Sequence, residues 1–172
     1  KPVIVWFQQD LRLSDNPALH AAAQSGAPVI CLYTFDDGAP GVWKMGGASR
    51  WWLHHSLKSL DKALNGRLVL RRGDALAVLQ DIIGQSGAGA VMWNRCYEPF
   101  AIARDTKIKS ALTADGVAVR SFNGALLHEP WALKTSGGTP FRVFTPFWKA
   151  MRHLSVGAPR PAPRNLQPLA VK

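Results

Sequence analysis

Cysteines are scarce in this chain of 172 residues, which has only Cys31 and Cys96. Two cysteines give no disulfide framework, so we expect a reducing compartment, the cytoplasm. No apolar run approaches the roughly 18 residues that a membrane-spanning helix needs, and no signal peptide is visible, so no membrane partner is expected. The five histidines are scattered, without acids or cysteines at ligand spacing, which predicts no metal site.

Glycine-rich phosphate-binding motifs are also missing. Neither G-x-G-x-x-G nor the P-loop pattern with its lysine occurs, and the pairs Gly46-Gly47 and Gly137-Gly138 follow no predicted strand in the required way. No histidine accompanies Cys96 that could activate it as a nucleophile. The sequence therefore predicts neither a P-loop enzyme nor one built on the dinucleotide fingerprint, and we assign no catalytic residue to this chain.

The formal net charge is +10, which invites a nucleic-acid interpretation. The charges are unevenly placed, however. No acid follows Glu129, and the seven basic residues after it leave only +3 for the first 129 residues. Because no run of Lys or Arg is interleaved with stacking aromatics, we expect a solvated basic surface rather than direct DNA binding by this chain alone.

Apolar strands and amphipathic helices alternate along the chain. The predicted strands are Val3–Phe7, Val29–Phe35, Arg67–Arg71, Ala90–Trp93 and Val117–Phe122. The predicted helices are Pro17–Gln24, Ala48–Leu64, Ala75–Gln85, Ala101–Ala114 and Phe147–Leu154, the last capped by Thr145-Pro146. Five strands with four crossovers predict an α/β, doubly wound, Rossmann-like fold, with a five-stranded parallel sheet and helices on both faces.

Four of the seven tryptophans fall within the five predicted strands and the four helices between them. Trp6 and Trp93 lie in strands, and Trp51 and Trp52 lie in a helix. Because large aromatic side chains at such positions usually dominate core packing, we expect all four in the core.

The composition changes near the end of the chain. Residues 155–172 contain four prolines and little apolar periodicity, which predicts an extended linker. We therefore divide the chain into an α/β domain, residues 1–154, and a Pro-rich linker, residues 155–172.

The segment from Val5 to Asn16, V-W-F-Q-Q-D-L-R-L-S-D-N, marks the expected ligand cleft. An apolar strand breaks there into a charged loop, and Asn16-Pro17 then reads as an N-cap followed by proline at the first helical position. Ligands of doubly wound folds bind at the carboxyl ends of the strands. This loop is therefore the first place to look for a binding site.

The same segment resembles the amino-terminal signature of the DNA photolyase and cryptochrome family, W-F-R-x-D-L-R-x-x-D-N, with Gln8 where the family usually has a basic residue. Met45–Leu53 resembles the loop and helix that follow the second strand in that family. Trp93–Asp105 resembles its N-x-x-Y-E-P-x-x-x-x-R-D segment, and Phe141–Trp148 resembles its Y-x-V-F-T-P-F-W motif. These four ordered motifs reach from one end of the predicted domain to the other.

The resemblance implies a division of labour between two domains. In the family, an all-helical domain after the linker holds FAD. Reduced FAD, excited by light, passes an electron to a cyclobutane pyrimidine dimer that is flipped out of the DNA, so that the dimer splits. The amino-terminal domain holds a second pigment, a folate, a deazaflavin or a flavin, which absorbs light and passes the energy to FAD.

The resemblance thus implies that this chain is the antenna domain of a cyclobutane dimer photolyase, a carbon–carbon lyase, and is inactive without the FAD domain. Its implied partners are its own carboxyl-terminal FAD-binding domain and, through the full-length protein, damaged DNA. We expect a monomer. Two alternatives remain open: a cryptochrome blue-light photoreceptor with the same domain, and a freestanding nucleotide- or flavin-binding domain.

The candidate pigment-binding residues stand at the ends of predicted strands or in the loops that follow them. Phe35 and Met45 would pack on the ring faces, Arg50 would meet a phosphate or carboxylate on the pigment's tail, and Glu98 would bind ring nitrogens. We expect one crevice that gathers Asp10, Arg12, Phe35, Asp36, Met45, Arg50, Asn94, Cys96 and Glu98.

A plainer role is possible for several of these residues. Arg12 or Arg50 could pair with Asp10, Asp36 or Glu98 merely to tie the strand-end loops together. Cys96 stands where the deazaflavin-binding members of the family often have an acid, and other members an arginine. Its thiol removes a charged partner of the pigment, or is simply a small, partly buried filler.

Overall fold

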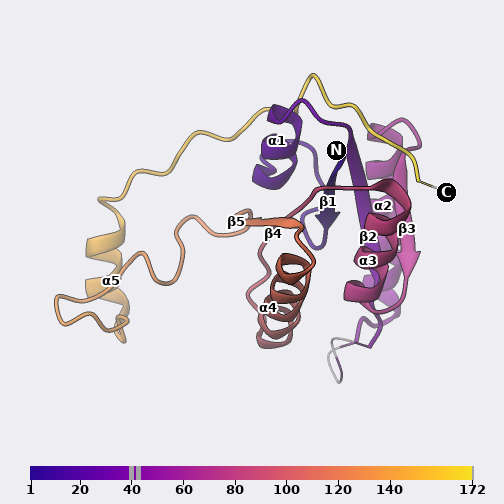
Figure 1. Cartoon of the computed structure of the whole chain (residues 1–172). Helices are drawn as coiled ribbons and strands as arrows, with labels where there is room; N and C mark the ends of the chain where they lie inside the picture. Colours follow the sequence, from indigo (N-terminus) through magenta and orange to yellow (C-terminus); the bar gives the residue numbers. More distant parts are fainter. Residues whose placement is uncertain (39–40, 42–43, 172) are drawn as a thin grey trace.

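The computed structural model describes residues 1–38, 41 and 44–171, so that Lys172, the last residue of the expected linker, lies outside it. The strands are β1 (Val3–Phe7), β2 (Val29–Phe35), β3 (Leu68–Arg72), β4 (Ala90–Asn94) and β5 (Ala118–Phe122). The helices are α1 (Pro17–Gln24), α2 (Gly47–Ala63), α3 (Ala75–Ser86), α4 (Pro99–Ala114) and α5 (Phe144–Met151). Figure 1 shows their arrangement.

The five strands form one parallel sheet in the order β3-β2-β1-β4-β5, and the predicted fold class is confirmed. From β1 the chain first proceeds through β2 to β3, and then returns to the other side of β1 for β4 and β5. The strand order therefore reverses between β1 and β4. In doubly wound folds this reversal leaves a crevice beyond the carboxyl ends of the strands, where ligands bind.

Helices cover both faces of the sheet, which is why all five residues of β1 are buried. On one face, Leu19 of α1 and Leu57 of α2 pack with Phe7. On the other face, Leu79 of α3 and Ile108 of α4 pack in one cluster. Each large apolar side chain removed from water in this way contributes about 1.5–3 kcal/mol to folding.

The predicted strand bounds agree with the structure to within one residue. The prediction for the last helix was wrong, because α5 begins at Phe144 and ends at Met151 instead of spanning 147–154. Thr145 and Pro146 lie inside its first turn instead of preceding it. Proline is tolerated there because the first backbone N–H groups of a helix have no partner within the helix.

The expectation for the tryptophans was correct for two of the four. Trp6 and Trp93 are each 1% exposed, and their rings meet edge to face with centroids 5.7 Å apart. Trp51 and Trp52 are 62% and 69% exposed, so their predicted core position was wrong. The buried residues of α2, Leu57 and Leu60, lie in its second half, and Leu53 is the residue of its first two turns that packs against the core cluster.

The last described residues, 155–171, contain no helix and are called the strap below. The strap passes α1 and reaches the amino end of β2, as the yellow trace in Figure 1 shows. There the Val29 N–H donates to the Gln167 carbonyl at 2.9 Å, and the Leu169 N–H donates to the Val29 carbonyl at 2.8 Å. Leu166 packs against the same core cluster as α1 and α2.

No helix in the part of the chain that the structure describes is long and apolar enough to cross a membrane.

Candidate functional site

Two cavities lie beyond the carboxyl ends of the strands. The first, called the aromatic pocket below, has a volume of about 540 Å³ and is bounded by the ends of β1, β2 and β3, by α2 and by the first turns of α4. The second, called the polar pocket, has a volume of about 850 Å³ and lies between the loops after β1, β4 and β5 and residues 156–160. Gln9 and Cys96 line both cavities, so the two share a wall.

Aromatic side chains form the inner surface of the aromatic pocket. Tyr33 and Phe35 lie two residues apart on β2 and therefore on the same face of the strand. Their rings meet edge to face with centroids 5.1 Å apart. Trp6 also lines the pocket, and its indole N–H donates to the Thr34 hydroxyl at 3.0 Å. Met45 remains 47% exposed at the rim. These side chains could contact a planar ring.

Polar groups gather at the end of this pocket where β1 and β4 finish. The Cys96 thiol donates to the Gln8 side-chain carbonyl at 3.2 Å, and Arg104 of α4 donates to the same oxygen. The Arg104 guanidinium also binds Asp105 and lies 4.8 Å from the centroid of the Trp6 ring. Arg104 thus supplies a cation next to Gln8. Gln8 itself stands where the family that the sequence resembles usually has a basic residue.

Burial sets the protonation of this polar cluster. It raises the pKa of the Cys96 thiol to about 12, and the charges of Asp105 and Glu98 act in the same direction. Burial also raises the pKa of Asp105, against the opposing effect of Arg104. Cys96 is therefore a neutral thiol at ordinary pH, a weak donor instead of a nucleophile.

A buried hydrogen-bond network occupies Asp10 and Asn94. The Asn94 amide donates to the Asp10 carboxylate at 2.6 Å and to the Asn16 side chain at 2.7 Å, and it accepts from the Ala18 N–H at 3.1 Å. Asp10 also accepts from Asn16, whose own carbonyl caps α1 through the Leu19 N–H. The three polar side chains of this network are each 8% exposed or less. They fix the turn from β1 into α1.

The residues of the polar pocket mainly hold loops. Arg12 donates to the backbone carbonyls of Gly124 at 2.6 Å and Asp15 at 2.9 Å, so it does tie loops together, but through carbonyls and not through an acid. Glu98 accepts from the Gln9 amide at 2.7 Å, and this bond is the main cause that lowers its pKa.

The structure places the nine candidates along two adjoining cavities instead of one crevice. Phe35, Asp36, Met45, Arg50 and Cys96 line the aromatic pocket. Asp10, Arg12, Asn94, Cys96 and Glu98 line the polar pocket. Gln9, in the loop after β1, lines both cavities, and the buried network holds its neighbour Asp10.

Sequence reasoning missed several residues of the aromatic pocket, among them Tyr33, Asp37, Arg72 and Arg104. Arg72 could have been found, because it ends β3 in the same way that Phe35 ends β2. Arg104 belongs to the Arg-Asp pair that closes the Y-E-P motif, but the motif alone does not indicate that its side chain returns to the pocket. Among the described residues, no three His, Cys, Asp or Glu side chains gather as they would around a metal ion.

Comparison with models of protein families gives a match over most of the chain. The family model described as DNA photolyase matches residues 3–164. A deoxyribodipyrimidine photo-lyase of Agrobacterium fabrum is 53% identical over 153 residues, which cover 87% of this chain and 31% of that protein. Cryptochrome-1 of Arabidopsis thaliana is 44% identical over 150 residues, which cover 85% of this chain and 22% of that protein. The chain therefore spans less than a third of the length of these relatives.

Solved structures of photolyases are also similar to this chain. A bacterial class III photolyase from Agrobacterium tumefaciens superposes with a TM-score of 0.90 at 48% identity, and the match covers 99% of this chain and 36% of that one. An archaeal photolyase from Sulfolobus tokodaii gives a TM-score of 0.79 at 25% identity, with 94% of this chain and 37% of that one covered. The latter structure is described as holding two FAD molecules, with the implication of a novel light-harvesting cofactor.

Proposed function

The chain belongs to the DNA photolyase family, and we propose that it is the amino-terminal light-harvesting domain of a deoxyribodipyrimidine photolyase. In this proposal residues 1–154 hold an antenna pigment, and residues 155–172 lead to a helical domain that binds FAD. The full-length protein would repair cyclobutane pyrimidine dimers in damaged DNA with light, as a carbon–carbon lyase, and this chain alone would be inactive.

The observation that carries the antenna role is the aromatic pocket. Its volume of about 540 Å³ lies within the range of cofactor sites, which bury a conjugated ring among apolar walls with a few polar groups. Tyr33, Phe35 and Met45 supply apolar and polarisable surface, while Gln8 and Cys96 supply an acceptor and a weak donor at one end. The residues present therefore fit a planar pigment.

Each side chain has a part in this role. Phe35 and Met45 would pack on the ring faces, and Gln8 would orient the polar edge of the ring while Arg104 holds its amide in place. When bound, the pigment would supply absorption of near-ultraviolet or blue light and pass that energy to FAD. The protein contributes a fixed position, a fixed orientation and the exclusion of water, because such transfer needs neither a bond nor a proton.

The pigment class remains a folate, a deazaflavin or a flavin. The description of the Sulfolobus photolyase, which names two FAD molecules and a novel light-harvesting cofactor, supports a flavin. The neutral thiol of Cys96, where a deazaflavin site often has an acid, disfavours a deazaflavin. Two free thiols support a reducing compartment such as the cytoplasm.

The test is the absorption spectrum of the longer protein, purified in the dark, together with repair of dimer-containing DNA under light. We expect an FAD spectrum with an additional pigment band. The Phe35→Ala variant should lose that band but keep FAD and keep repair under saturating light. Ile102→Ala, at an exposed position of α4 that lines neither cavity, is the matched control and should keep the band. FAD without a second pigment in the unaltered protein would overturn the antenna role, and absence of FAD would overturn the photolyase assignment.

A cryptochrome is the second candidate, because cryptochrome-1 of Arabidopsis thaliana is 44% identical to this chain. The same experiment distinguishes the two. A protein that binds FAD but does not repair dimers under light would be a photoreceptor.

A further inference from the structure

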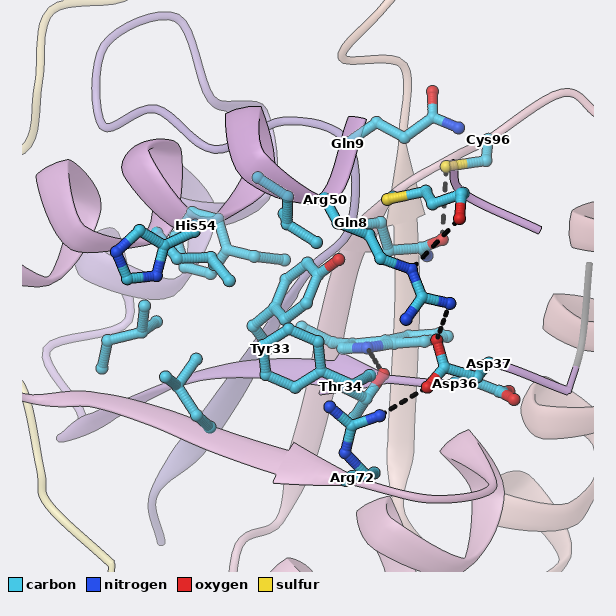
Figure 2. A pocket seen from close by; sticks show the side chains of 18 of the residues that line it. Gln8, Gln9, Tyr33, Thr34, Asp36, Asp37, Arg50, His54, Arg72 and Cys96 are labelled. Atoms are coloured by element: carbon cyan, nitrogen blue, oxygen red, sulfur yellow. Dashed lines mark hydrogen bonds and ion pairs between the residues drawn. The ribbon is translucent and has the colours of Figure 1, made fainter. Parts of the chain in front are cut away.

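Two arginines converge on one carboxylate at the mouth of the aromatic pocket. Arg50 lies in the first turn of α2, and Arg72 is the last residue of β3. Asp37, just after β2, lies between them: Arg72 donates to one of its oxygens, and Arg50 lies 3.7 Å from the other. Figure 2 shows Asp37 between the two guanidinium groups.

Other contacts hold both guanidinium groups in place. The Arg50 Nε donates to the Met45 carbonyl at 3.1 Å. The Arg72 guanidinium lies over the Phe35 ring, 5.2 Å from its centroid. Neither position depends on Asp37 alone, so the two cations would remain at the rim if the carboxylate moved aside.

The link through Asp37 is a weak one. The side chains of Arg50, Asp37 and Arg72 are 55%, 51% and 68% exposed. Ion pairs this accessible to water contribute little to stability, since solvent screens the attraction and the side chains lose rotamer freedom. An incoming anion that binds both arginines would replace the carboxylate at small cost.

The surroundings also favour an anion. Lys44 and Lys58 line the same pocket, and the first turn of α2 has no acidic residue and no side-chain cap on Gly46. The partial positive charge of a helix amino terminus adds to the field of the arginines. Asp36 and Asp61, the other two acids that line the pocket, do not outnumber the bases.

We propose that Arg50 and Arg72 form an anion subsite at the mouth of the aromatic pocket. The Asp37 carboxylate occupies this subsite in the free protein, and an anionic ligand displaces it. The ligand is a pigment with an anionic tail, either the phosphate of a flavin nucleotide or a carboxylate of a glutamylated folate. Both groups accept two hydrogen bonds from a guanidinium. This inference rests on the proposed function, because the ring of the same ligand occupies the pocket.

The test compares ligands that share a ring but differ in the tail. The chain is titrated with FMN and with riboflavin, and separately with methenyltetrahydrofolate carrying three glutamates or one, following pigment fluorescence. We expect the more anionic member of one pair to bind at least tenfold more tightly. The pair that shows the difference identifies phosphate or carboxylate as the natural tail.

Variants then test whether an anionic ligand displaces the Asp37 carboxylate from the two arginines. Asp37→Asn should tighten binding of the anionic ligand at least threefold and leave riboflavin binding unchanged. Arg72→Gln should abolish the difference in the pair that shows it. Arg71→Gln, which removes the same charge from the neighbouring residue outside the pocket lining, should preserve it.

Two results would overturn the subsite. If FMN and riboflavin bind equally, the two folates bind equally and Asp37→Asn changes nothing, the subsite is wrong while the antenna proposal stands. If no pigment binds to the chain or to the longer protein, both proposals fail. Competition by inorganic phosphate against FMN but not against riboflavin would be independent support.

Discussion

At the scale of single residues, identical side-chain types serve opposite purposes. Asp10 is buried and shares its oxygens among Gln8, Asn16 and Asn94, whereas Asp37 is half exposed between two arginines. The first carboxylate is part of the fold, because losing it would leave buried donors without a partner. The second can be displaced. Strand-end position predicted that acids would gather here, but only the backbone path determines which of them is buried.

Cys96 provides a prediction about pH. Its pKa of about 12 leaves very little thiolate at pH 8, so iodoacetamide should react with the native protein at least about a hundredfold more slowly than with a free thiol. The rate should rise with pH up to 11 without a plateau. Protein unfolded in urea is the internal control and should react at the ordinary rate. A plateau below pH 9 in the native protein would contradict the raised pKa.

Asn94 provides a prediction about stability. Asn94→Ala removes a donor to Asp10 and Asn16 and leaves the Ala18 N–H without its acceptor, so the free energy of unfolding should fall by about 1–3 kcal/mol. Urea denaturation measures the change. Asn165→Ala, at an exposed turn in the strap, should change it by less than about 0.5 kcal/mol. Equal losses in the two variants would contradict the role of the network.

At the scale of secondary structure, periodicity predicted each strand and helix, and the errors occurred where packing is absent. The strands lie within one residue of their predicted bounds because each has apolar residues on both faces and turn residues beside it. The limits of α5 were missed because no side chain of this helix is buried and none caps it. The exposure of Trp51 and Trp52 was missed for a related reason, since sequence does not indicate which residues of α2 pack against the core.

The strap provides a prediction at this scale. Leu166→Ala should lower the free energy of unfolding by about 1–2 kcal/mol, because this side chain packs against the core cluster that α1 and α2 share. Hydrogen exchange should also show faster exchange of the Leu169 amide, which is bonded to Val29. Gln167→Ala, whose side chain is exposed and whose backbone bond is unaffected, is the control. An unchanged Leu169 amide in Leu166→Ala would mean that the strap is held by its backbone bonds alone.

At the scale of the whole molecule, an exposed apolar surface remains on α5 and the loop before it. Phe144 is 72% exposed and Trp148 45%, with their rings stacked 6.3 Å apart, and Leu127 and Trp131 are also exposed. Patches of this kind usually mark an interface with another protein surface. In the proposed parent this surface would meet the helical domain.

The isolated chain should therefore self-associate, whereas the full-length protein, in which this surface would be covered, is the one expected to be a monomer. Replacing both Phe144 and Trp148 with Gln should reduce the associated fraction in sedimentation velocity at the same protein concentration. The unfolding midpoint should not change, because α5 buries no residue. Lys149→Gln on the same helix is the control and should associate like the unaltered chain. Undiminished association of the double variant would assign the contact to another surface.

The edge-to-face pair of Trp6 and Trp93 gives the domain an optical property of its own. Trp6 lines the aromatic pocket, so a conjugated ring bound there would lie near an indole. Such a ring absorbs at the wavelengths where indole emits. Ultraviolet quanta absorbed by the pair would be delivered to the ligand, and the loss of tryptophan fluorescence would report, without any label, when the pocket fills.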